Sequence, residues 1–216
     1  MNFSEALKEL RKKSKKRNFD QTFDLIINLK NFDPRREAIN TFIVLPNVVK
    51  KKKICAFLEH PSKIVDYVIT KDDIDRISLK DIKKLAKEYD FFIANAKLMP
   101  KIASKFGKIL GMAGKMPDPK IGGVLVQENE KNIEEVVKKL SSIVKIKSKE
   151  ASIKIGLGKE SMPDNDLIKN VETAFKTIIK VLPKKELNIK SVMFKFTMSP
   201  PIKIKEQTKQ KRKIKK

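Results

Sequence analysis

The spacing of hydrophobic residues follows two different patterns along this chain, one at both ends and another in the middle. In residues 22–30 (TFDLIINLK) apolar side chains occupy every second position, which predicts a strand with one buried face, made of Phe23, Leu25, Ile27 and Leu29. The same two-residue period returns in NTFIVLP (40–46, stopped by Pro46), IVKIKSK (143–149), ASIKIGLG (151–158) and NIKSVMFKFTMSPPIKIK (188–205). Amphipathic helices are predicted beside these strands, over residues 3–16 and 161–182.

The middle of the chain has a different pattern. Short apolar strands are predicted in ICAFL (54–58), DYVIT (66–70) and DFFIA (90–94). Helical spacing predicts helices between and after them, over residues 78–89, 99–110 and 132–141, and Ser78 with Asp81 forms a capping-box pattern at the start of the first. Alternating strands and helices indicate a small α/β layer with a mainly parallel sheet.

Half-buried strands at both ends of the chain and an α/β block between them predict a discontinuous architecture. We expect domain one in residues 1–49 and 143–205, an inserted domain two in residues 50–142, and a basic flexible tail in residues 206–216. The fold class is α+β, with the terminal segments forming an antiparallel-sheet α/β sandwich and the insertion a Rossmann-like three-layer α/β domain. Two chain crossings would let the domains hinge.

The net charge of the chain indicates what kind of partner it binds. The formal net charge is +24 and the isoelectric point is near 10.0, so a polyanion is expected to neutralise the protein. Nucleic acid is the first candidate and an anionic membrane the second. No run of 18 apolar residues occurs, which disfavours the membrane and predicts a cytoplasmic protein.

Candidate catalytic chemistry is weak. GMAGKMPDP (111–119) fails as a phosphate-binding loop, because two residues rather than four separate Gly111 from Gly114 and Met116 stands at the hydroxyl position. GLGKES (156–161) lacks a third glycine at dinucleotide spacing. Cys55 and His60 are the only cysteine and histidine, so no disulfide, metal cluster or triad can be built. We expect no cofactor and no enzymatic activity.

A nucleic-acid surface fits better. On the face of the terminal sheet that points away from the core, alternation places lysines among hydroxyl, amide and carboxylate groups: Thr22, Asp24, Asn28, Lys30, Lys154, Ser191, Lys195, Thr197 and Ser199. Such groups suit phosphate and 2′-hydroxyl contacts, although a merely solvated face would have a similar composition. RNA is preferred over DNA, because no helix-turn-helix, zinc-finger or homeodomain pattern occurs.

Several segments resemble one family. RNFDQTFDLIINLK, DPRRE, IVLP, LMPKIASKFGKILGMAGKMPDP and NIKSVMFKFTMSPP occur in the order and spacing of the universal ribosomal protein L-one family of the large subunit, in its archaeal-type form, over nearly all of residues 17–204. The resemblance implies a discontinuous two-domain protein of the lateral stalk beside the tRNA exit site, bound to large-subunit rRNA. It also implies contact with exit-site tRNA and its release, repression of the protein's own mRNA, and a monomer when free of the ribosome.

The resemblance also implies particular contacts. The segment that begins at Arg17 and Asn18 carries Phe19 where the family packs an aromatic ring against RNA, and Thr22 and Asp24 follow it. In the closing strand the matching positions are Ser191, Thr197, Met198, Ser199 and Pro200. By alternation Met198 shares the side of the core phenylalanines, so its contact with RNA requires the backbone to leave strand geometry.

Two positions depart from the family pattern. Ser199 stands where the family has glycine, and it either follows a different local path or contributes an outward hydroxyl contact. Met112 and Ala113 replace a proline and a basic residue, which puts RNA or tRNA contact by that loop in doubt. Two alternatives to a ribosomal protein remain: a non-ribosomal RNA-binding protein or chaperone of the same fold, and a nucleotide-dependent enzyme that uses the insertion.

Overall fold

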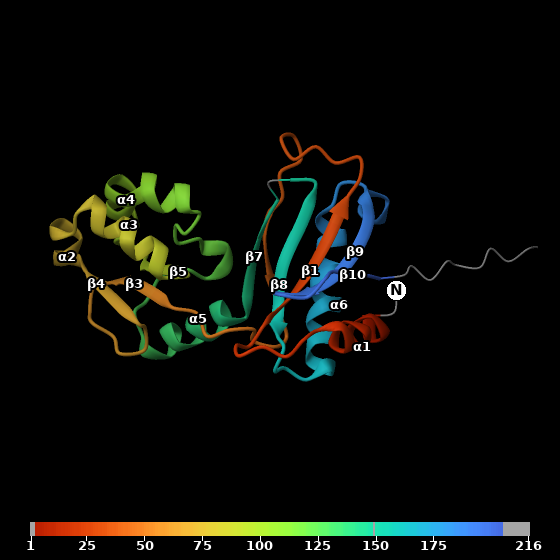
Figure 1. The fold of residues 1–216 in the computed structure, drawn as a ribbon. Helices are drawn as coiled ribbons and strands as arrows, with labels where there is room; N and C mark the ends of the chain where they lie inside the picture. Colours follow the sequence, from red (N-terminus) through yellow and green to blue (C-terminus); the bar gives the residue numbers. More distant parts are fainter. Residues whose placement is uncertain (1–2, 149, 205–216) are drawn as a thin grey trace, which may run out of the picture. The chain divides into compact units, whose positions relative to one another are not determined.

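A computed structural model describes residues 3–148 and 150–204 of the 216-residue chain (Figure 1). Tertiary contacts divide the chain into two compact units, which we describe separately. Unit one contains the chain up to Val49 and from Val144 onwards, and unit two contains Lys50–Ile143. The predicted tail, 206–216, lies outside the described residues.

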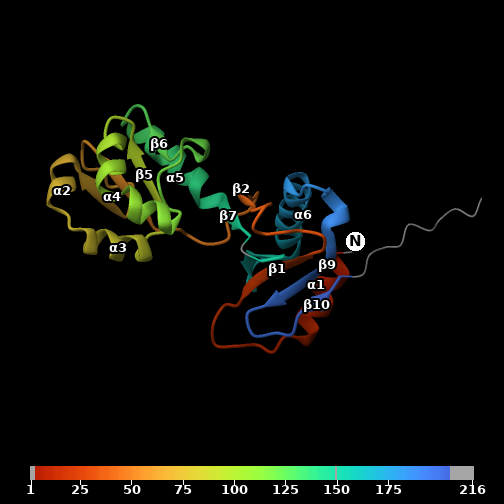
Figure 2. The ribbon, with the colours of Figure 1, turned by 90° about the horizontal axis from the view of Figure 1, so that it is seen from above.

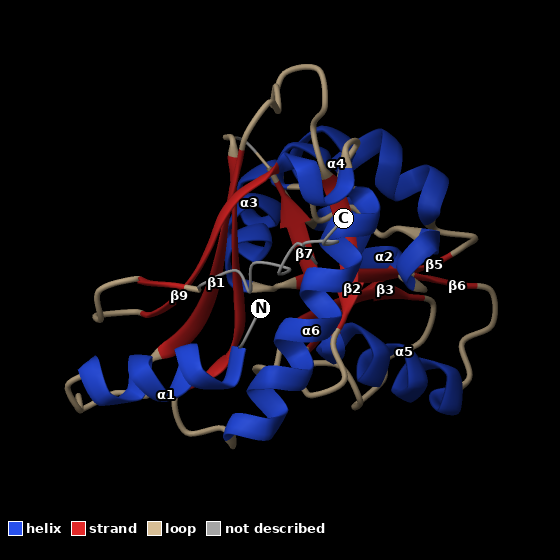
Figure 3. Cartoon of the chain, turned by 90° about the vertical axis from the view of Figure 1, so that its right-hand side faces the viewer, coloured by secondary structure: helices blue, strands red, loops and turns tan. Residues whose placement is uncertain are grey.

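Unit one is built on a four-stranded antiparallel sheet. Its order is β10 (Ile202–Lys203), β9 (Ile189–Phe196), β1 (Thr22–Leu29) and β8 (Ser152–Lys159). Helices α1 (Phe3–Lys13) and α6 (Asp164–Val181) pack against one face of this sheet (Figure 3). A short 3₁₀ helix, η2 (Lys185–Asn188), precedes β9, and β2 (Asn40–Val44) pairs with β7 (Ile143–Lys147) in a separate two-stranded sheet.

The alternation in β1 sets the orientation of this sheet. All four of its predicted inward residues are buried in the core of unit one, and the residues between them are half-buried. The Phe23 ring packs edge-on against Phe194, with ring centroids 5.0 Å apart, and in a tilted arrangement against Phe196 at 5.7 Å, so the central strands share an aromatic cluster. With α1 and α6 on the core side, the opposite face of the sheet carries the polar residues.

Unit two is an α/β layer with a parallel sheet. The strand order is β4 (Tyr67–Thr70), β3 (Ile54–Leu58), β5 (Phe91–Asn95) and β6 (Val124–Leu125). Figures 1 and 2 show one face of this sheet covered by helices and the other by a single helix. The helices are α2 (Lys71–Arg76), α3 (Leu79–Glu88) and α4 (Met99–Ala113) on the first face and α5 (Glu130–Ser142) on the second; η1 (Pro119–Ile121) is a 3₁₀ turn before β6.

Local sequence signals explain the helix boundaries in unit two. The Ser78 hydroxyl accepts the Asp81 N–H at 3.3 Å and donates to the Asp81 carboxylate at 2.7 Å, as its spacing predicts. Gly114 ends α4 in the left-handed conformation (φ 65°), which glycine adopts without steric cost.

The mixed α/β class expected from the sequence is confirmed by this architecture. Strands of period two lie in unit one, and the strands of the α/β block lie in unit two. No helix in the described part of the chain is long and apolar enough to cross a membrane.

Candidate nucleic-acid interface

The outer face of the sheet in unit one has polar ends and an apolar middle. Strand register places Asn28 beside Ser191 of β9, and the Asn28 amide donates to the Ser191 hydroxyl at 3.0 Å. Two residues further along β1, half-buried Ile26 lies between half-buried Met193 of β9 and exposed Lys154 of β8, which form the next row across the sheet. Flat, partly apolar rows suit bases or riboses, while the surrounding polar groups suit the backbone of a nucleic acid.

Asp24 occupies the row nearest the end of β9. It lies between Gly156 and Lys195 in register, and burial raises the pKa of its carboxyl, while the charges of Lys195 and Lys159 oppose that rise. A Cβ atom at position 156 would lie 3.1 Å from the Thr22 side chain and 3.4 Å from the Asp24 carboxylate. Glycine therefore leaves room on β8 for these two side chains.

The basic residues predicted for this face differ in their surroundings. Lys154 is exposed, but its ammonium is 3.3 Å from the Glu150 carboxylate. Lys30 is exposed one residue beyond β1, where its backbone N–H donates to the Asn188 carbonyl at 2.7 Å. The Lys195 ammonium donates to the Thr197 carbonyl at 3.0 Å and lies at the edge of the turn that follows β9. All three ammonium groups are within reach of a polyanion on this face.

The turn after β9 presents Thr197 and Met198 to solvent. β9 ends at Phe196, and the Thr197 hydroxyl accepts the Thr22 N–H at 3.0 Å, which fastens the turn to the start of β1. Met198 is 59% exposed because the chain leaves strand geometry before it, as its proposed contact requires. Pro200, which follows, is exposed as well.

The expectation that Ser199 faces outward is wrong. Its side chain is buried (6% exposed), and its hydroxyl accepts the Phe196 N–H at 2.9 Å. The cause is a reverse turn, closed by the Ser199 N–H donating to the Phe196 carbonyl at 3.1 Å, which turns residue 199 back toward the core. Among the described residues only Asn31 and Lys185 combine a side chain with positive φ, so serine is not strained at position 199.

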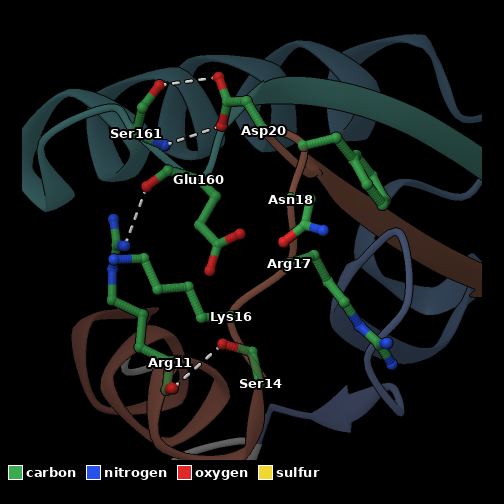
Figure 4. A pocket seen from close by; sticks show the side chains of 9 residues that line it. Arg11, Ser14, Lys16, Arg17, Asn18, Asp20, Glu160 and Ser161 are labelled. Atoms are coloured by element: carbon green, nitrogen blue, oxygen red, sulfur yellow. Dashed lines mark hydrogen bonds between the residues drawn. The ribbon is translucent and has the colours of Figure 1, made fainter.

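A hollow of about 620 Å³ adjoins this turn and contains the first predicted contacts (Figure 4). Phe19 is 51% exposed on its wall, between Asn18 and Asp20, and Arg17 and Lys16 add positive charge. The hollow is further lined by Arg11, Ser14, Glu160 and Ser161. An exposed aromatic ring beside a guanidinium and an ammonium group offers both stacking and charge to a nucleotide.

Polar contacts made by two residues, Asp20 and Arg11, hold the walls of the hollow. The Asp20 carboxylate accepts the Ser161 N–H at 3.1 Å and its hydroxyl at 2.8 Å. The Arg11 guanidinium donates to the Glu160 carbonyl at 2.9 Å and to the Asp164 carboxylate at 2.6 Å. The segment with Phe19 is thus joined to the loop between β8 and α6, although the two are far apart in sequence.

Sequence reasoning missed several residues of this region, among them Arg11, Glu160, Lys159 and Gln21. Arg11 and Glu160 line the hollow, Lys159 donates to the Thr22 hydroxyl at 3.2 Å, and Gln21 is buried beneath the turn. For Gln21 a signal existed, because position 21 continues the inward series of β1. For Lys159 the simple alternation fails, because a bulge between Phe23 and Asp24 shifts the pairing with β8.

The segment at 111–119, which fails as a phosphate loop by its spacing, also lacks the geometry of one. A phosphate loop leads into the N-terminus of a helix, whereas Gly111 and Gly114 lie at the C-terminal end of α4. The Lys115 ammonium donates to the Tyr89 carbonyl at 2.6 Å. Met112 and Ala113, the two departures from the family pattern, form the last turn of α4, and Met112 is exposed.

The remaining candidate groups offer no reactive centre. Cys55 is buried in β3, where burial raises the pKa of its thiol to about 12. His60 contributes its backbone N–H to the Glu128 carboxylate at 3.2 Å. In residues 3–148 and 150–204 no three His, Cys, Asp or Glu side chains are grouped to hold a metal ion.

Comparison with known proteins adds independent evidence. The sequence model of the Ribosomal protein L1p/L10e family matches residues 10–200. The chain is 39% identical to the large ribosomal subunit protein uL1 of Nanoarchaeum equitans over 202 residues, which cover 89% of this chain and 95% of the relative. It is 38% identical to the uL1 protein of Pyrococcus abyssi, over 93% of this chain and 94% of the relative. It is 33% identical to the uL1 protein of Methanocaldococcus jannaschii, over 96% of this chain and 97% of the relative.

Proposed function

The chain belongs to the Ribosomal protein L1p/L10e family, in its archaeal-type form, and from that premise we infer that it binds rRNA through the outer face of unit one. Family membership makes it a structural constituent of the large ribosomal subunit, with the ribosome in the cytoplasm as its location and large-subunit rRNA as its partner. It also confirms the expectation that the chain is not an enzyme.

One observation carries the assignment to this face. Met198 and Phe19 are large apolar side chains, 59% and 51% exposed, yet they lie in segments joined by hydrogen bonds and surrounded by basic residues. Single exposed apolar side chains are common, but two of them in neighbouring, hydrogen-bonded segments beside positive charge form a surface that a partner can cover. Contact with the bases and riboses of RNA would bury both groups while the lysines neutralise phosphates.

The predicted residues divide by the contact each would make. The cationic residues would contact phosphates and position the protein: the exposed Arg17, Lys30 and Lys154, and the half-buried Lys195. Phe19 and Met198 would contact bases or sugars, with Pro200 beside them. Thr22, Asn28, Ser191 and Thr197 can donate to or accept from 2′-hydroxyl groups, and Asn18 can do the same at the hollow. Asp24 would add an acceptor, and Ser199 would support the turn from inside.

The finer functions rest on the same surface and on the family. We propose that residues 1–49 and 143–205 form the rRNA-binding domain and that residues 50–142 form an inserted Rossmann-like, three-layer domain; the division of contacts at residues 49/50 and 143/144 supports this. We further propose that the protein assists release of exit-site tRNA, represses its own mRNA by the same RNA contacts, and is a monomer when free of the ribosome.

Binding to RNA of matched charge tests the assignment. The full chain should bind an in vitro transcript of archaeal large-subunit rRNA more tightly than the same transcript with shuffled sequence, at a fixed salt concentration. Phe19→Ala should reduce this preference, whereas Leu187→Ala should not, because Leu187 is an apolar residue 74% exposed in η2, at the opposite end of β9 from the turn. Equal affinity of the wild type for both RNAs would remove specific rRNA recognition from this chain.

Cosedimentation with ribosomes separates a ribosomal protein from a free RNA chaperone of the same fold. The nucleotide-dependent enzyme finds no support, because the Gly111–Lys115 segment ends a helix and its lysine is engaged by a backbone carbonyl. ATP or GTP hydrolysis that Lys115→Ala abolishes would restore that alternative.

A further inference from the structure

Gln21 is a buried polar residue at the centre of the candidate interface. It is 1% exposed and sits one residue before β1, so it cannot itself contact RNA. Its amide oxygen accepts the Met198 N–H at 3.0 Å, and its amide nitrogen donates to the Glu160 carboxylate at 3.0 Å and to the Lys15 carbonyl at 3.4 Å. One side chain therefore joins the turn after β9, the loop after β8 and the segment after α1.

The orientation of the amide follows from its partners. The Met198 N–H can only donate, so it requires the amide oxygen, whereas the carboxylate and the carbonyl can only accept and require the amide nitrogen. The Gln21 carbonyl also accepts the Glu160 N–H at 2.8 Å, so residues 21 and 160 are linked through backbone and side chain together. No other assignment satisfies all these groups.

We propose that Gln21 is a positioning residue for RNA recognition, which sets the turn carrying Met198 against the hollow that contains Phe19. This inference rests on the proposed RNA-binding function and adds to it a residue that RNA does not touch. Without the amide, the Met198 N–H and the Glu160 carboxylate would lose part-buried hydrogen bonds, and the turn would be held from this side only by the Thr22–Thr197 bond. The two apolar contacts would then no longer be presented at a fixed spacing.

The amide of Gln21 and the carboxylate of Glu160 have nearly the same shape, so the two groups can be exchanged between these positions. In Gln21→Glu the new carboxylate still accepts from Met198 but faces the Glu160 carboxylate, with no donor between them. In the double variant Gln21→Glu/Glu160→Gln the amide at position 160 donates to the carboxylate at position 21, so the bond between these two positions returns with its direction reversed. The bond from the Met198 N–H keeps its direction, and only the longer bond to the Lys15 carbonyl is lost. Glu160→Gln alone retains an acceptor for the Gln21 amide and is the matched control.

The experiment compares these variants in the full chain with the archaeal rRNA transcript and its shuffled counterpart. Gln21→Glu should weaken binding to the rRNA about tenfold, with little change for the shuffled RNA, and hydrogen exchange at the Met198 amide should accelerate. The double variant should bind within about threefold of the wild type, and Glu160→Gln should keep the Met198 amide protected from exchange. A role in general stability alone predicts equal loss for both RNAs and no recovery in the double variant.

The outcomes separate this inference from the function on which it rests. Wild-type affinity in a folded Gln21→Glu, or weak rRNA binding by a folded double variant with a protected Met198 amide, overturns the positioning role and leaves RNA binding intact. Should Gln21→Glu not fold, the double variant decides the question in the same way. No preference of the wild type for the rRNA overturns the proposed function itself, while Met198 exchange still reports on the Gln21 contact.

Discussion

The Thr197 hydroxyl accepts a hydrogen bond from the Thr22 backbone N–H at 3.0 Å, across 175 residues of sequence. This bond joins the beginning of β1 to the turn after β9, and both residues were expected on the outer face of the sheet. Thr197 is also exposed to solvent, so the residue that fastens the turn is available for the RNA contact proposed above. The first two predictions test this turn as a contact surface for RNA.

Thr197→Ala is expected to weaken specific rRNA binding by about 1–3 kcal/mol, because it removes both the fastening of the turn and a hydroxyl contact. Thr197→Ser keeps the hydroxyl and should bind within about 0.5 kcal/mol of the wild type. Filter binding or calorimetry with the rRNA transcript measures both. Equal losses in the two variants would mean that the threonine methyl group, rather than the hydroxyl, makes the contact.

Met198→Ala is expected to weaken specific binding by about 1–3 kcal/mol without changing the free energy of unfolding by more than about 0.5 kcal/mol. The reason is that an exposed side chain stabilises the free protein little but can be buried by RNA. Met112→Ala, an exposed methionine of unit two, is the matched control and should leave the affinity unchanged. Unchanged affinity in Met198→Ala would exclude this side chain from the interface.

Ser199→Ala tests the buried side of the same turn. The change removes the acceptor of the Phe196 N–H, and an unpaired buried N–H costs about 1–3 kcal/mol, so the free energy of unfolding should fall by that amount. Denaturant unfolding measures it. Ser199→Gly should fall further by a few tenths of a kcal/mol, since glycine adds chain entropy to the unfolded state. A more stable glycine variant would indicate that the serine side chain strains the turn.

These positions also show which features of the fold and of the candidate site can be predicted from the sequence. Alternation in β1 and the capping pattern at Ser78 predicted the buried side of the sheet and the start of α3, because both depend on local spacing alone. The departure of Met198 from the strand followed from two prolines that cannot donate to a ladder. The inward direction of Ser199 could not be predicted, because a reverse turn changes the face of a residue without a periodic signal. Arg11 and Glu160 depend on a contact between segments about 150 residues apart in sequence.

Asp24→Asn is expected to make the stability of the protein less dependent on acid pH. Burial raises the pKa of Asp24 in the folded state, so its contribution to stability is greatest below the ordinary pKa of 3.8 and is lost as the pH rises through the folded value. The free energy of unfolding of the variant, relative to the wild type, should therefore increase from pH 3 towards neutrality. The opposite trend would show that Lys195 and Lys159 outweigh burial at this carboxyl.

Lys52 gives the corresponding prediction at alkaline pH and in unit two. Its ammonium donates to the Leu140 and Ile143 carbonyls at the end of α5 and lies 4.9 Å from the Phe91 ring centroid. Burial lowers the pKa of Lys52 from 10.5 to about 8, with the Asp90 charge opposing the shift. Between these values the unfolded chain binds more protons than the folded one at this residue, so Lys52 makes stability rise with pH across that window.

Lys52→Met should remove this rise. Denaturant unfolding of wild type and variant at pH 7.5 and 9.5 gives the difference in slope, and Lys51→Met, which removes an exposed neighbouring charge, controls for net charge. The variant should lose less stability at pH 7.5 than at pH 9.5, because the folded lysine carries the cost of a buried charge at the lower pH and is largely relieved of it at the higher. A loss that is equal at both values would mean that the ammonium is as well solvated by the helix carbonyls as by water. In that case capping of α5, rather than charge burial, would be the whole contribution of Lys52 to unit two.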